Sequence, residues 1–212
     1  MPNPIYTAQT CPNPAYQLNW SYSLFWHLPP IESHWLKALT TETEQDGIRI
    51  LQHRFTGSST SQFLVSTRPG VSPQILVQRL KGRLQHLLKG SMPNAFQRNY
   101  SFKTSHAIYW YNLHLVMVHD GRFREIRDDH AQKRLRAIGN IASVKGHLLS
   151  RAALLPDHLH LALRCDLAES PEQVALAYLN NLAFVEGMKP VFRFGYYVGT
   201  FGEYDLGVIP HE

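Results

Sequence analysis

An internal repeat constrains the fold of this chain more than any other feature. The same Ser-Pro pair occurs at Ser72 and at Ser170, 98 residues apart, and a segment with helical periodicity follows each pair. Serine is a preferred helix N-cap, and proline suits the first helical position. Beyond each helix the same four residue types recur in the same order: Met92, Phe96, Tyr100 and Thr104, then Met188, Phe192, Tyr196 and Thr200. The sequence therefore predicts a tandem duplication.

The segments before each Ser-Pro pair also correspond. An aromatic, alternating strand is expected at 19–28 and at 108–118, a helix at 34–46 and at 128–145, and a further strand at 59–67 and at 157–165. Strands that alternate with separate helices predict an α+β fold, in which an antiparallel sheet carries its helices on one face. The expected organisation is an N-terminal extension (1–18), a first half (19–104) and a second half (105–212). No long linker separates the halves, so we expect them to pack as an internal pseudo-dimer.

The apolar residues of the expected helices fall at helical spacing. In the first half Leu76, Leu80, Leu84, Leu87 and Leu88 form one stripe, and in the second half Leu135, Ile138 and Ala142 form another. Such stripes predict the faces that pack against the sheets.

The charge balance is mildly basic, with 21 Lys and Arg residues against 16 Asp and Glu residues and a net charge of +5. This balance permits nucleic-acid binding without requiring it. The bases gather in two acid-poor stretches, and solvated helix faces are the alternative interpretation. The candidate nucleic-acid contacts are Arg79, Lys81, Arg83, Lys89, Arg98, Lys103, Arg134 and Arg136.

Composition also excludes several classes of protein. Cys11 and Cys165 are too few for a disulfide scaffold or a four-cysteine metal site. No apolar run approaches the length of a membrane helix, and no signal peptide is visible, so a cytoplasmic protein without membrane contact is expected.

The sharpest local motif is Asp157-His158-Leu159-His160-Leu161. Side chains alternate along a strand, so both imidazoles would share one face and could converge on a divalent metal ion. A packing role is the alternative, because a His-x-His pair is a weak signal by itself. The corresponding residues of the first half are Thr60 and Gln62, which predicts a single metal site, in the second half.

These segments together resemble the insertion-sequence-200-like transposases, which are single-tyrosine HUH enzymes. The resemblance rests on the Asp-His-Leu-His-Leu strand, the Ser-Pro helix after it, the aromatic strand ending in Tyr197-Val198-Gly199-Thr200, and the matching segments of the first half. It implies two HUH-type, ferredoxin-like halves. In the family two chains merge their sheets, and each active site takes its His pair from one chain and its tyrosine from the other.

The resemblance implies transposition of single-stranded DNA. The His pair would hold Mg²⁺ or Mn²⁺ at the scissile phosphate, and a tyrosine would form a 5′-phosphotyrosine link. The chain departs from the family because no helix that could carry this tyrosine follows Thr200 or Thr104. Tyr204 is the nearest substitute by position, and Tyr178 is a helical alternative. Asp157, Gln62, Glu203 or His211 could complete the metal shell.

Three functions remain open at this stage. The first is a transposase-derived protein that binds single-stranded or hairpin DNA with impaired or altered catalysis. The second is an active metal-dependent tyrosine transposase or nicking enzyme. The third is a structural subunit of a larger nucleoprotein complex, with structured RNA or a protein as partner. A chain that forms its own pseudo-dimer could act as a monomer.

Overall fold

The structure is a computed structural model that describes residues 3–30, 34–56, 58–89, 103–104, 107–108, 110–120, 128–200 and 205–206. The chain forms two compact α+β units. The first unit contains residues 18–109 and 202–212, and the second contains residues 1–17 and 110–201. Neither unit is therefore continuous in sequence, whereas the expected halves, 19–104 and 105–212, were.

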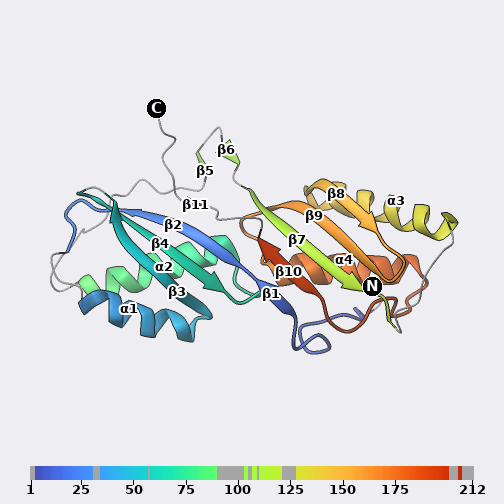
Figure 1. Cartoon of the computed structure of the whole chain (residues 1–212), viewed down its shortest axis with the longest axis horizontal. Helices are drawn as coiled ribbons and strands as arrows, with labels where there is room; N and C mark the ends of the chain where they lie inside the picture. The colour runs from blue at the N-terminus through green and yellow to red at the C-terminus, as the bar shows by residue number, and fades with distance from the viewer. Residues whose placement is uncertain are drawn as a thin grey trace. The chain divides into compact units, whose positions relative to one another are not determined.

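The first unit has a four-stranded sheet in the order β11-β2-β4-β3, drawn with its helices in Figure 1. Its antiparallel part consists of β2 (Asn19–Phe25), β4 (Thr60–Thr67) and β3 (Ile48–Thr56), and the short β11 (Asp205–Leu206) pairs with β2 in parallel. The helices are α1 (His34–Gln45) and α2 (Pro73–Leu88). A separate two-stranded ladder joins β5 (Lys103–Thr104) to β6 (Ala107–Ile108).

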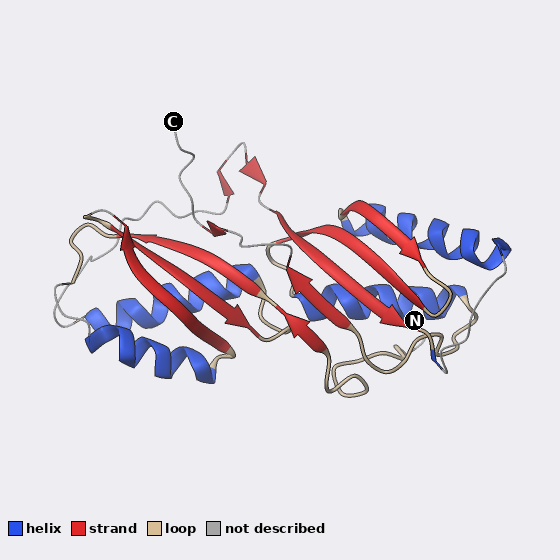
Figure 2. Cartoon of the chain, viewed as in Figure 1, coloured by secondary structure: helices blue, strands red, loops and turns tan. Residues whose placement is uncertain are grey.

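The second unit has a five-stranded sheet in the order β1-β10-β7-β9-β8. Its strands are β1 (Ala15–Gln17), β10 (Tyr197–Thr200), β7 (Trp110–Val118), β9 (His158–Asp166) and β8 (Leu148–Leu154). All neighbours are antiparallel except β1 and β10. The helices α3 (Asp128–Lys145) and α4 (Pro171–Val185) lie on one side of the sheet, as Figure 2 shows.

Both units follow one plan of strand, helix, two strands and helix, and their three central strands have the same order, β2-β4-β3 and β7-β9-β8. The plan extends to irregular details. The register of β3 shifts between Ile50 and Gln52, and that of β8 shifts at the matching place, between Leu149 and Arg151. Gly47 and Gly146 end α1 and α3 with φ of 75° and 70°, a conformation that favours glycine. Such shared irregularities are what a duplicated chain would keep.

The helix starts are those predicted from the Ser-Pro pairs. Ser72 and Ser170 are both N-caps, and each side-chain oxygen accepts a hydrogen bond from a backbone N–H of the first turn, that of Ile75 and of Gln173. The backbone N–H of Ser170 in turn donates to Oε1 of Gln173, which completes a capping box. No helix within the described residues is long and apolar enough to cross a membrane.

The core of each unit lies between its sheet and its helices. Leu76, Leu80, Leu84 and Leu88 of α2 are buried, as the stripe predicts. The stripe predicted for α3 is wrong at one position: Leu135 is 42% exposed, while Arg134 beside it is only 5% exposed. The helix therefore turns Arg134, Ala137, Ile138 and Ile141 inward. An arginine can occupy such a face because it has a buried partner, described below.

Candidate functional site

His158 and His160 lie at the start of β9 on the sheet face that points away from α3 and α4. Leu159, Leu161 and Leu163 alternate with them and are buried under the helices. The two imidazole rings are neighbours, with centroids 4.8 Å apart. The predicted arrangement of the pair on one half-buried face therefore exists.

Two further side chains hold these rings. Nδ1 of His158 lies 2.6 Å from a carboxylate oxygen of Asp157 and donates to it, which leaves Nε2 as the nitrogen that carries the lone pair whenever the ring is neutral. Nδ1 of His160 lies 2.8 Å from Nε2 of His114 on β7, and these two rings stack with centroids 5.0 Å apart. Burial, followed by the nearby His114 and His158, lowers the pKa of His160, which favours the neutral ring that a metal ligand requires.

The two imidazoles supply some, but not all, of the ligands that a divalent cation needs. With Nδ1 of both rings engaged, Nε2 of His158 and Nε2 of His160 are the atoms that would bind it, provided that His160 donates its Nδ1 proton to His114. Within the described part of the chain, no group of three or more His, Cys, Asp or Glu residues is arranged to hold a metal ion. Oxygen atoms from a bound phosphate and water would have to complete the shell.

The first unit carries a different set at the same place. Thr60 and Gln62 occupy the first and third positions of β4, as His158 and His160 do on β9. Gln62 donates a 3.4 Å bond to Oγ of Ser21 on β2, and the register places Ser21 where β7 has His114. Oε1 of Gln62 accepts a 2.7 Å bond from Nε of Arg54 on β3. This set has no metal-binding nitrogen or carboxylate.

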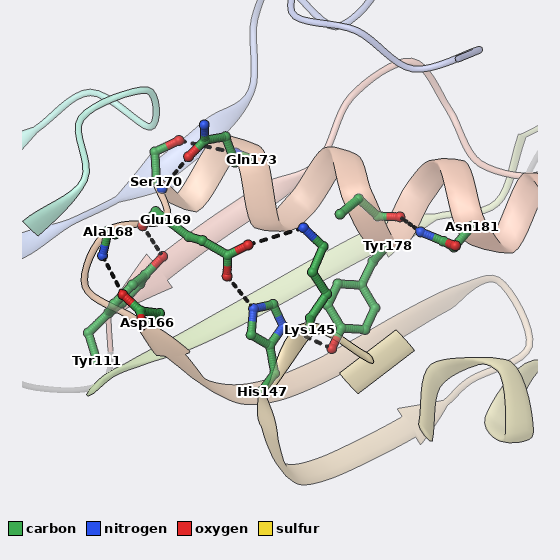
Figure 3. Close-up of polar contacts among 11 residues, drawn as sticks. Tyr111, Lys145, His147, Asp166, Ala168, Glu169, Ser170, Gln173, Tyr178 and Asn181 are labelled. Carbon is green, nitrogen blue, oxygen red and sulfur yellow. Dashed lines mark hydrogen bonds and ion pairs between the residues drawn. The ribbon is translucent and has the colours of Figure 1, made fainter. Parts of the chain in front are cut away.

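Of the two candidate nucleophiles, Tyr204 lies outside the described residues. Tyr178 lies on α4 and is completely buried, with its hydroxyl 3.3 Å from Nδ1 of His147 (Figure 3). Burial raises the pKa of Tyr178 well above its usual range. A hydroxyl that is buried on the helix side of the sheet cannot attack a phosphate at the His pair, so the assignment of Tyr178 is wrong.

The polar cluster around Tyr178 is structural. His147 is fully buried between α3 and β8, and its Nε2 lies 2.5 Å from a carboxylate oxygen of Glu169. The other oxygen of Glu169 accepts a 3.1 Å bond from Lys145, and its backbone carbonyl accepts one from Tyr111 (Figure 3). Glu169 directly precedes the N-cap of α4, so the cluster ties the end of α3 to the start of α4.

We expect this tie to weaken in acid. The hydrogen bond from His147, followed by Lys145, lowers the pKa of Glu169. Its contribution is therefore complete above the ordinary carboxyl pKa and is lost as pH falls through the lowered one. Urea unfolding at neutral pH should show Glu169→Gln less stable than wild type by about 1.5–3 kcal/mol, and the difference should shrink in acid. Glu44→Gln, at an exposed ion pair with Arg49, is the control and should cost less than about 1 kcal/mol. A difference that does not depend on pH would contradict the assignment.

The predicted contacts Arg79 and Arg83 bind a carboxylate of their own unit. Arg83 pairs with Asp46 at 3.2 Å, and Arg79 donates a 2.8 Å bond to the backbone carbonyl of Asp46. Asp46 follows α1, so both arginines fasten α2 to the end of α1. Both arginines are partly exposed, but the carboxylate of Asp46 largely neutralises their charge.

The other predicted contacts of the first half differ in exposure. Lys89 is exposed, and Lys81 is half-buried, with its pKa lowered by burial. Arg98 and the side chain of Lys103 lie outside the described residues.

The prediction that Arg134 contacts nucleic acid is wrong, because the guanidinium of Arg134 is buried. It donates 3.2 Å and 3.0 Å bonds to Glu186 and to Nε2 of His119. Arg136 is exposed, and it lines a groove of about 480 Å³ between α3 and α4 together with Lys133, Val144 and Phe184. This groove is on the helix side of the sheet, away from His158 and His160.

Sequence reasoning did not single out His114 or Tyr197. His114 alternates with Leu113 and Leu115, which marks it as a residue of the polar face, but its contact with His160 depends on the register of β7 and β9. Tyr197 of β10 is half-buried, and its ring packs edge-on against His114 with centroids 5.8 Å apart. Alternation alone places His114 on the polar face of its strand, but the register of the sheet is needed to bring either residue beside the His pair.

Comparisons with known proteins give weak likenesses. No family model and no curated protein matches the chain. A chain from Deinococcus radiodurans R1, provisionally described as a transposase, is 20% identical over 47% of this chain and 85% of its own length, with a TM-score of 0.43. A REP-associated tyrosine transposase bound to a REP hairpin is 10% identical over 47% and 63%, with a TM-score of 0.38. An unknown protein from Galdieria sulphuraria is 13% identical over 85% and 96%, with a TM-score of 0.24.

Proposed function

We propose that this protein is a tandem-duplicated relative of the insertion-sequence-200-like transposases that binds single-stranded or hairpin DNA and carries one divalent-metal site, with impaired or altered catalysis. The observation that carries the proposal is the pair of imidazoles, His158 and His160, which Asp157 and His114 support from either side on the open face of β9. Such supporting contacts orient metal ligands and fix their tautomers.

The duplication is supported by details that the fold does not require. Both units have the same strand order, the same register shift in the outer hairpin strand, a positive-φ glycine after the first helix, and a Ser-Pro start of the second helix. If the two units share one ancestor, their residues at the proposed metal site can be compared position by position. His158 and His160 in one unit correspond to Thr60 and Gln62 in the other, so one chain would hold one metal ion.

The metal would supply Lewis-acid polarisation of a phosphate oxygen when bound. His158 and His160 would hold it through Nε2, Asp157 would keep the tautomer of His158, and His114 would keep that of His160. Mn²⁺ should bind better than Mg²⁺, because imidazole suits the softer ion. Impaired catalysis is proposed because Tyr178, the one of the two tyrosines predicted from the sequence that the structure describes, is buried away from this face.

The test of this function is a binding and trapping experiment with the full chain. We expect labelled single-stranded and hairpin DNA to bind with an affinity that falls as salt rises, because phosphate contacts release counterions. We expect no denaturation-resistant protein–DNA adduct with Mn²⁺. Absence of binding to both DNAs would contradict the proposal.

Tyr197 favours a second candidate function, that of an active tyrosine transposase or nicking enzyme. Its ring contacts His114 on the same face as the His pair. An adduct in the trapping experiment would support this function. Tyr197→Phe and Tyr204→Phe would then show which hydroxyl forms the link, since only the variant that lacks the nucleophile loses the adduct.

A further inference from the structure

The first unit has an arginine at the place where the second unit would hold its metal ion. Arg54 lies opposite Gln62 in the register of β3 and β4, and Ala153 lies opposite His160 in the register of β8 and β9. Since Gln62 corresponds to His160, Arg54 corresponds to Ala153. A guanidinium beside His160 would repel a divalent cation, whereas alanine does not. With a metal ion bound at the proposed site, each unit would have a positive charge at this position: a fixed side chain in the first unit and the metal ion in the second.

The side chain of Arg54 is oriented by its own unit. Its Nε donates a 2.7 Å bond to Oε1 of Gln62, and Gln62 is held in turn by a bond to Oγ of Ser21. Within the described residues no carboxylate pairs with Arg54. In contrast, Arg49 of the same strand pairs with Glu44 of α1, and Arg79 and Arg83 bind Asp46. Arg54 is exposed, so its two terminal nitrogens can donate to a ligand. A guanidinium anchored at Nε presents a fixed fork for two oxygens.

We propose that Arg54, anchored by Gln62 and Ser21, is a metal-independent binding site for a phosphodiester group of single-stranded nucleic acid. The proposal deepens the proposed function and rests on it, because it adds a second phosphate site in the unit that lacks the His pair. The two units would then bind the same chemical group by different means. Only the contact made by the second unit would require Mn²⁺.

The test is the salt dependence of binding to a labelled single-stranded oligonucleotide, measured with the full chain in EDTA. Arg54→Ala should weaken binding about tenfold and lower the slope of log K against log salt by about 0.7, the value for one phosphate of a single strand. Arg54→Lys should recover the slope but not the full affinity, because it keeps the charge and loses the fork. Gln62→Ala should also weaken binding, since it frees the guanidinium.

Arg49→Ala is the matched control. It removes the same charge from the same strand, but its guanidinium already pairs with Glu44, so slope and affinity should stay close to those of wild type. Equal melting temperatures would show that all variants fold. If wild type binds and Arg54→Ala behaves like Arg49→Ala, the Arg54 site is wrong while the proposed function stands. If wild type binds no nucleic acid, with or without Mn²⁺, both proposals are wrong.

Discussion

Replacing both His158 and His160 by alanine should abolish Mn²⁺ binding by the full chain and leave its metal-free affinity for hairpin DNA within a few-fold. Both rings lie on the half-buried face of β9, and their Nε2 atoms are the proposed ligands. Isothermal titration with Mn²⁺, followed by DNA titration in EDTA, measures the two effects separately. Any metal-dependent DNA cleavage by wild type should disappear as well.

Further variants separate ligands from neighbours. His114→Ala should lower Mn²⁺ affinity about 10–100-fold without abolishing binding, because it orients His160 and does not contact the metal. His130→Ala, on α3, should leave Mn²⁺ affinity unchanged. If the double variant instead binds Mn²⁺ normally, or loses about 2–4 kcal/mol of stability as buried side chains do, the imidazoles serve packing and the metal site is wrong.

Arg134→Ala should destabilise the protein by about 3–5 kcal/mol, because it removes the guanidinium that lies 3.2 Å from the largely buried Glu186 and leaves only His130, at 4.0 Å, beside that carboxylate. The position of Glu186 increases this loss of stability, because Glu186 is the C-cap of α4 and the helix dipole disfavours a negative charge there. Arg134 also donates to His119, and the variant would lose this hydrogen bond as well. Urea unfolding measures the loss, and DNA affinity measured where the variant is folded should equal that of wild type.

Two comparisons make this result specific. Arg136→Ala removes an exposed charge from the same helix and should change stability by less than about 0.5 kcal/mol. Arg134→Met combined with Glu186→Leu should recover most of the stability, because an apolar pair of similar volume can replace a buried ion pair. A stable Arg134→Ala variant with weakened DNA binding would restore the interpretation of Arg134 as a DNA contact.

Local signals in the sequence were sufficient for the four helices and for the strands β2, β4, β7 and β9, but not for β1, β3, β8 or β11. The Ser-Pro pairs placed the starts of α2 and α4, and strict alternation placed Leu159 and Leu161 inward and the two histidines outward. Both rules depend on residues a few positions apart, which the backbone geometry relates directly. The fold class and the shared face of the His pair were therefore predictable.

Contacts between distant residues were not predictable in this way. The sequence predicts Arg79 and Arg83 as nucleic-acid contacts and does not reveal their partner, because Asp46 lies 33 and 37 residues away and meets them only when α2 packs beside α1. Arg134 was assigned to the surface because a buried arginine requires a partner, and Glu186 is far away in sequence. The bond between His114 and His160 depends on a register that periodicity does not fix.

The parallel edge strands β1 and β11 determine where the chain can be cut to isolate one unit. β1 comes from the beginning of the chain and completes the sheet built mainly by its later part, while β11 comes from near the end and joins the sheet built by its earlier part. A cut between residues 104 and 105 would leave each fragment without the strand that borders β10 or β2. The exposed backbone donors and acceptors would then invite pairing with other chains. Fragments meant to isolate one unit should carry the missing strand as a fused segment.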